Sequence, residues 1–155
     1  FERGDIAEYD ANAPADMVVT LHACDTATDY ALHNAVCRGA RMIFSVPCCQ
    51  HELNGQIASD RLRLITRYGI IKERFAALMT DAIRANLLES RGYKTQVLEF
   101  VDLSHTPKNL LIRAIKKRPA LDNAGRIALD EAKALMEEFS LEPTLYSLLY
   151  PHSAD

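Results

Sequence analysis

Two short segments carry the residue types that could perform chemistry. They are His22–Asp25 and Pro47–His51. Histidine can act as a general base near neutral pH, and an aspartate can orient an imidazole or accept a substrate proton. We therefore take His22, Asp25 and His51 as the candidate catalytic residues.

The elements around these segments predict that they meet at one edge of a sheet. Met17–His22 and Arg41–Val46 are β-branched, apolar runs typical of buried strands, and Thr26–Arg38 between them has a helical pattern that Gly39 ends. A strand, a helix and a strand form a right-handed βαβ unit whose strands are parallel. Open α/β sheets bind ligands at the carboxyl ends of such strands.

A third segment is predicted at the same edge. Thr95–Leu103 and Asn109–Ile115 are candidate strands, and the short link between them favours an antiparallel return. That return brings His105–Asn109 to the edge, where Gln50 and Asn109 could offer paired donors and acceptors to a planar substrate. The candidate substrate-binding residues are Pro47, Cys48, Cys49, Gln50, Lys108 and Asn109.

The remaining pattern is helical. Apolar residues recur at helical spacing in Ile71–Ser90 and Asp122–Phe139, and more weakly in Ile57–Tyr68. Leu141–Tyr150 is apolar and suits a tail or a short helix. Strands alternating with helices indicate the α/β class.

Composition limits the classes of function. The 155 residues suit one domain, and a net charge of -3 argues against a broad nucleic-acid surface, although Lys116–Arg118 is a local basic patch. The apolar runs are too short to span a bilayer, and no signal segment opens the sequence. We therefore expect no membrane partner, and we expect the four cysteines to be reduced thiols of a cytoplasmic protein.

Other interpretations of the site residues remain open. Asp25 could be the N-cap of the helix that follows it, and the cysteines could be small buried hydrophobes. A tetrahedral zinc site could draw on His22, Cys24, Cys48, Cys49 and His51. However, the sequence has no C-x-x-C pair, and adjacent cysteines are poor chelate spacing, so we assign no metal.

Longer motifs carry a resemblance to a known family. Asp16–Thr28, Val46–Leu53 and His105–Ala114 resemble segments of class I S-adenosylmethionine-dependent methyltransferases. The resemblance is to the methyltransferase domain family that includes bacterial members and the eukaryotic methyltransferase-like protein 25 group. It implies a Rossmann-like sheet, mostly parallel with an antiparallel last strand. Residues 1–118 would be the C-terminal part of the domain, and residues 119–155 a helical C-terminal extension.

The resemblance also implies cofactor contacts. Gly4-Asp5-Ile6 matches a segment near the adenine, and Leu21, His22 and Ala23 match a segment lining cofactor and substrate. The family's glycine-rich loop and first three strands would precede Phe1. The chain would then be a fragment that binds S-adenosylmethionine weakly or not at all, and its exposed sheet edge would favour self-association.

These observations predict a methyltransferase whose acceptor is unknown, with RNA among the candidates. One alternative is a non-catalytic binding module with a methyltransferase-like fold. Another is a thiol- or zinc-dependent enzyme built on Cys24, Cys48, Cys49 and His51.

Overall fold

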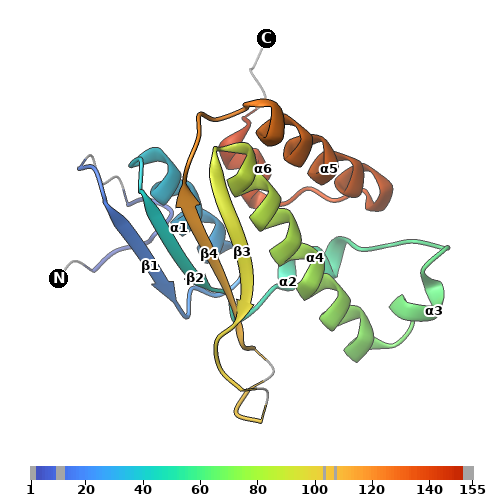
Figure 1. The fold of residues 1–155 in the computed structure, drawn as a ribbon. Helices are drawn as coiled ribbons and strands as arrows, with labels where there is room; N and C mark the ends of the chain where they lie inside the picture. Colours follow the sequence, from blue (N-terminus) through green and yellow to red (C-terminus); the bar gives the residue numbers. More distant parts are fainter. Residues whose placement is uncertain (1–2, 10–12, 103, 107, 152–155) are drawn as a thin grey trace.

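The computed structural model describes residues 3–9, 13–102, 104–106 and 108–151 (Figure 1). Strands and helices alternate along the first half of the chain, as the α/β class requires. The elements are β1 (Met17–Leu21), α1 (Thr26–Cys37), β2 (Met42–Val46), α2 (His51–Gln56), α3 (Arg63–Thr66), α4 (Gly69–Ser90), β3 (Tyr93–Glu99), β4 (Leu110–Lys116), α5 (Asn123–Phe139) and α6 (Thr144–Leu149).

The four strands form one mixed sheet in the order β1-β2-β4-β3. β1 and β2 are parallel and end together, since Leu21 lies opposite Val46. β4 is antiparallel to both of its neighbours. The expected α/β class and the antiparallel last strand are thus confirmed, and β4 starts at the edge where β1 and β2 end.

One face of the sheet is covered by helices. α1 packs on β1 and β2, α4 packs on β3 and β4, and both helices share one hydrophobic core with the buried strand residues. The strand residues beneath them are fully buried, as at Ile43 and Ile112, and Tyr93 donates from its hydroxyl to Ala40 O at 2.8 Å. On this face Thr20 Oγ1 also donates to Ser45 Oγ at 2.8 Å, which satisfies two buried hydroxyl groups between β1 and β2.

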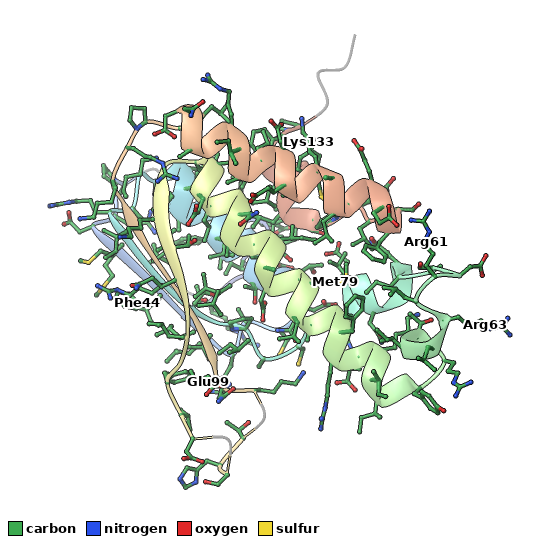
Figure 2. All side chains as sticks on the ribbon, turned by 45° about the vertical axis from the view of Figure 1, so that its right-hand side comes forward. Phe44, Arg61, Arg63, Met79, Glu99 and Lys133 are labelled. Carbon is green, nitrogen blue, oxygen red and sulfur yellow. The ribbon has the colours of Figure 1, made fainter. Side chains whose placement is uncertain are left out.

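The opposite face of the sheet is open among the described residues, and its part over β1 and β2 is apolar. Met17, Val19 and Leu21 alternate along β1 and are 51%, 52% and 62% exposed. Figure 2 shows Phe44 of β2 on this side, away from α4 and α5, and it lies opposite Val19 in the register. We call this surface the open sheet face; its exposed members include Met17, Val19, Leu21, Met42 and Leu98.

The C-terminal helices complete the same hydrophobic core. Asp122 caps α5 by accepting from Gly125 N at 2.8 Å, and α5 then packs on α4. α6 packs on α1, with Leu145 fully buried. Between residues 119 and 151 the chain forms α5 and α6, and both share a core with the sheet.

One predicted helix is wrong. We expected a helix over Ile57–Tyr68, but the chain forms α2 before it and only the four-residue α3 within it. Ile57 is buried directly after α2, whereas Leu64 is 70% exposed. The apolar residues of this stretch do not share one buried face. Their helical spacing in the sequence therefore did not correspond to a helix in the structure.

Candidate active site at the sheet edge

The loops after β1 and β2 are bonded to each other at the edge of the sheet. Asp25 N donates to Cys49 O at 3.1 Å. The carboxylate of Asp25 accepts from His51 N at 2.8 Å and from Glu52 N at 3.0 Å. The predicted convergence of His22–Asp25 and Pro47–His51 is therefore present.

The backbone of the first loop adopts an unusual conformation. His22 and Asp25 have positive φ values of 58° and 53°, a region that L-residues other than asparagine, aspartate and glycine rarely adopt. Asp25 precedes α1, yet its side chain makes no cap to α1. Its carboxylate instead caps α2, so its N-cap role belongs to a different helix from the one the sequence suggested.

A buried ion network centred on Arg84 of α4 is hydrogen-bonded to the backbone of this loop. Arg84 of α4 is 1% exposed and binds both carboxylate oxygens of Asp29, with Nε to Oδ1 at 2.9 Å and Nη2 to Oδ2 at 2.8 Å. Its Nη2 also donates to Asp25 O at 2.9 Å, and its Nη1 donates to Asp81 Oδ1 at 3.2 Å. Because buried charges are tolerated only when paired, this network holds α1, α4 and the loop in one arrangement.

Gln50 joins this network to a cavity. Its Nε2 donates to Asp81 Oδ2 at 3.0 Å, whereas its buried Oε1 has no hydrogen-bond partner. A buried amide oxygen without a partner costs about 1–3 kcal/mol, so it is suited to a donor on a ligand. Gln50 and Asp81 both line the cavity.

The cavity has a volume of about 520 Å³, within the usual range for small-molecule sites. It contains four of the six predicted substrate-binding residues, drawn from the ends of β2 and β4. α4 supplies the opposite wall, and Glu99 at the end of β3, labelled in Figure 2, is another lining residue. The lining residues include Pro47, Gln50, Glu73, Arg74, Asp81, Glu99, Lys108 and Asn109.

Two acidic groups near the site have raised pKa values. Burial raises the pKa of Asp81 to about 6, although Arg84 and Gln50 oppose the shift. Burial also raises the pKa of Glu52, whose carboxylate accepts from Thr144 N at 3.1 Å and so ties α2 to α6. Asp81 is therefore a cavity residue that changes its protonation close to neutral pH.

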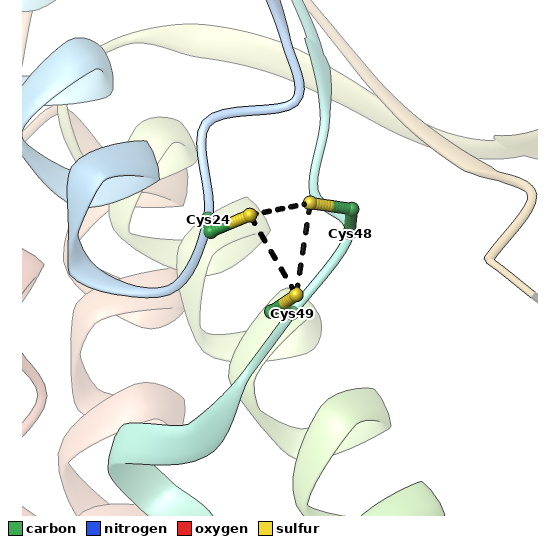
Figure 3. Close-up of side chains that lie close together, drawn as sticks. All are labelled: Cys24, Cys48 and Cys49. Carbon is green, nitrogen blue, oxygen red and sulfur yellow. Dashed lines mark hydrogen bonds between the residues drawn. The ribbon is translucent and has the colours of Figure 1, made fainter.

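Three thiols gather beside the cavity (Figure 3). Cys24 Sγ lies 3.1 Å from Cys48 Sγ and 3.7 Å from Cys49 Sγ, and the last two sulfurs are 3.8 Å apart. Burial, and then hydrogen bonds with Cys24 and Cys49, raise the pKa of Cys48 to about 12. All four cysteines of the chain are free, and Cys37 lies apart from this group, beside His33.

Several predicted site residues lie outside the cavity. His22 and His51 are exposed, and neither lines it. Leu21 is exposed on the open sheet face, while Ala23 O accepts from the Thr28 hydroxyl. Asp5 and Ile6 lie in a turn that Asn34 ties to α1, by donating from Nδ2 to Ile6 O at 3.1 Å. Of the third segment, Lys108 and Asn109 reach the cavity, His105 is exposed, and Pro107 is outside the described residues.

Sequence reasoning missed the contribution of α4. Asp81, Arg84 and Glu73 belong to a stretch interpreted only as an amphipathic helix. A signal was present, since Asp81 and Arg84 interrupt the apolar positions Met79 and Ile83 at i, i+3 spacing. Two opposite charges within the apolar positions of a helix indicate a buried ion pair. They do not show that Asp29 of α1 also pairs with Arg84.

Comparison with known proteins adds one finding. Residues 1–56 match the model of a family described as a methyltransferase domain. The matched region contains β1, α1, β2 and α2, and with them both loops of the sheet edge. No curated protein and no solved structure matches the chain. In the part of the chain that the structure describes, no helix has the length and apolar character to cross a membrane.

Proposed function

We propose that residues 1–118 are the C-terminal part of a class I S-adenosylmethionine-dependent methyltransferase domain, with residues 119–155 as its helical extension. The observation that carries the proposal is the joined pair of loops at the sheet edge. Both loops lie within the region matched by the methyltransferase family model, and the second borders the cavity. The sheet edge would then present the acceptor to the methyl group.

The proposed cofactor contacts are Asp5, Ile6, Leu21, His22 and Ala23. Leu21 is 62% exposed, and Asp5 and His22 are also exposed, so each of the three is accessible to a ligand. S-adenosylmethionine would supply both the methyl group and its own leaving group. The task left to these residues is to hold the cofactor against the sheet edge in a fixed orientation.

The cavity is the proposed acceptor site. Gln50 Oε1 offers a free acceptor, which suits an N–H donor on a planar group such as an amide or a nucleobase. Pro47, Lys108 and Asn109 share the cavity, with Cys48 and Cys49 immediately beyond Pro47. RNA is one acceptor of this kind, and a protein side chain or a small molecule is another. The free cysteines suit the reducing cytoplasm, where we place the protein.

A proton acceptor is needed only if the attacking atom carries a proton at working pH. His22, Asp25 and His51 are the candidates from the sequence. Asp81 joins them, because it lines the cavity and its pKa is raised to about 6. A carboxylate with that pKa is ionised at neutral pH and is a stronger base than an ordinary aspartate.

Strands preceding β1 would complete the proposed domain. Within the described residues β1 pairs only with β2, which leaves its other edge free. Parallel sheets in α/β proteins are covered on both faces, whereas the open sheet face exposes Met17, Val19 and Leu21. Both features support further strands and helices of the domain on this side.

Isothermal titration calorimetry tests the cofactor. We expect saturable binding of S-adenosylmethionine to a chain extended by its native upstream sequence, and weaker or no binding to the 155-residue chain. Methyl transfer is then measured with labelled cofactor on RNA, protein and metabolite pools. Absence of heat from the extended chain would refute the methyltransferase proposal, and binding without turnover would favour the non-catalytic module.

A matched pair of variants tests the cavity. Lys108→Met should lower methyl transfer at least about tenfold, equivalent to ~1.4 kcal/mol, and leave cofactor binding unchanged. Lys117→Met is the control, because Lys117 is exposed and does not line the cavity. Equal transfer rates for the two variants would remove the cavity as the acceptor site.

A further inference from the structure

The three thiols of Cys24, Cys48 and Cys49 come from two loops that the sequence separates by more than twenty residues. Figure 3 shows their sulfur atoms facing one another in a triangle, between the end of β1 and the end of β2. Two of the three hydrogen-bond contacts join thiol to thiol across these loops. Thiols are weak hydrogen-bonding groups, so these contacts alone explain little of why three are placed together.

We propose that this cluster is a binding site for one Zn²⁺ ion, ligated by the sulfurs of Cys24, Cys48 and Cys49. A Zn–S bond of about 2.3 Å in tetrahedral geometry places neighbouring sulfurs about 3.8 Å apart. The Cys24–Cys49 and Cys48–Cys49 sulfurs already lie at 3.7 and 3.8 Å. Only the Cys24–Cys48 separation of 3.1 Å must widen.

The backbone around the cluster is already held in place. Asp25 N bonds Cys49 O, and the Asp25 carboxylate bonds the first two amides of α2, so the loops are joined directly after Cys24. Before the thiols, the pairing of β1 with β2 holds the two strands together as far as Leu21 and Val46. Arg84 fixes the carbonyl of Asp25 from the buried side. A site whose supporting residues are locked needs little rearrangement to accept an ion.

The fourth coordination position would be open. Among the described residues, the group that could hold a metal comprises these three thiols, with no histidine nitrogen or carboxylate in it. Cys24 is exposed, so water or an incoming thiol or nitrogen could reach the ion. Three protein ligands and one open position are the pattern of catalytic rather than structural zinc sites.

The adjacency of Cys48 and Cys49 argued against a chelate at the level of sequence. The structure removes that objection, because the two side chains turn to place their sulfurs 3.8 Å apart beside a third. Thiolates also select soft ions such as zinc over magnesium or calcium. Binding converts three thiols to thiolates, with one proton released from each that was protonated. The proposal does not depend on methyl transfer.

Zinc titration of the reduced, chelator-stripped chain tests the site. We expect one equivalent of Zn²⁺ to bind, with proton release, and Co²⁺ to give the visible absorption of tetrahedral thiolate coordination. Loss of a residue that only hydrogen-bonds to a metal ligand lowers metal affinity about 10- to 100-fold. Cys24→Ser removes a ligand itself, so it should weaken zinc binding by more than that. Cys24 is exposed, so this variant should fold, and circular dichroism checks that it does.

Cys37→Ser is the matched control, since Cys37 is also exposed but contacts His33 rather than the cluster. It should bind zinc as tightly as the unchanged chain. Failure of the reduced chain to bind stoichiometric zinc would overturn the proposal. So would equal weakening by Cys24→Ser and Cys37→Ser, or binding of Cu⁺ with no binding of Zn²⁺.

Discussion

Asp25 joins the two loops of the sheet edge through its side chain and its backbone. Its carboxylate caps α2, its amide bonds Cys49 O, and its carbonyl accepts from Arg84. The geometry therefore gives it a positioning role beside the catalytic role proposed from its residue type. Asp25 makes these contacts from a backbone conformation with a φ of 53°.

Asp25→Ala should lower the free energy of unfolding by about 1–2 kcal/mol, the cost of losing an N-cap. Asp25→Asn is the matched variant, because asparagine can also cap a helix, so its loss should be under about 1 kcal/mol. Urea denaturation measures both, and equal losses would contradict the capping role.

At the residue scale, the sequence predicted which loops meet but not the buried ion network of Arg84, Asp29 and Asp81 that contacts them. The strand ends placed His22–Asp25 beside Pro47–His51, because parallel strands end at one edge. The partners of Arg84 lie 55 positions away in α1 and three away in α4. Only the packing of α4 across the loop shows why a charged pair lies within an apolar helix.

At the scale of elements, the turn from α4 into β3 depends on Gly92. Its φ is 89°, and a Cβ built there would lie 2.2 Å from Arg118 O. Lys117 N and Arg118 N both donate to Gly92 O, at 3.0 and 3.2 Å. The segment after β4 is therefore packed directly on this glycine, and neither backbone can yield easily.

Gly92→Ala should destabilise the chain by about 3 kcal/mol or more, because the clash is with main-chain atoms. Gly39→Ala is the comparison, since Gly39 also has a positive φ, of 65°, but its Cβ would have no heavy atom within 4 Å. That variant should lose only about 1–2 kcal/mol, from conformation alone. Thermal and urea unfolding measure both, and similar losses would show that the crowding is unimportant.

The long helices were predictable and the short ones were not. α1, α4 and α5 carry a periodic pattern over twelve or more residues, and their predicted bounds agree with the structure to within two positions. α2 has only six residues, among them Asn54 and Gly55, which are weak helix formers. The first amides of α2 donate to the Asp25 carboxylate, so this helix is stabilised by a tertiary contact. The spacing of apolar residues in the sequence cannot predict such a contact.

At the scale of the whole molecule, the open sheet face borders the edge of β1 that has no strand partner among the described residues. An unpaired strand edge is a template for pairing with another chain. Val19 is 52% exposed at the middle of β1 and lies opposite Phe44, so it belongs to both the face and the edge. The 155-residue chain by itself should therefore self-associate as its concentration rises.

Val19→Lys should suppress that association, because a charge at an edge strand opposes pairing with a second chain. Ile127→Lys is the control, since Ile127 is 53% exposed but lies on α5, away from the sheet. Light scattering over a concentration series should give a monomer for the first variant and unchanged association for the second. A clean monomer for the unchanged chain at high concentration would refute the prediction.

The buried ion network has a consequence for how the molecule unfolds. Arg84 of α4 is paired with Asp81 within its own helix, but it compensates the charge of Asp29 only while α1 and α4 are docked. Breaking such a buried group by removing one partner costs about 3–5 kcal/mol, so an intermediate with one helix detached is strongly disfavoured. We therefore expect α1 and α4 to unfold together, and α4 carries the cavity wall that contains Asp81.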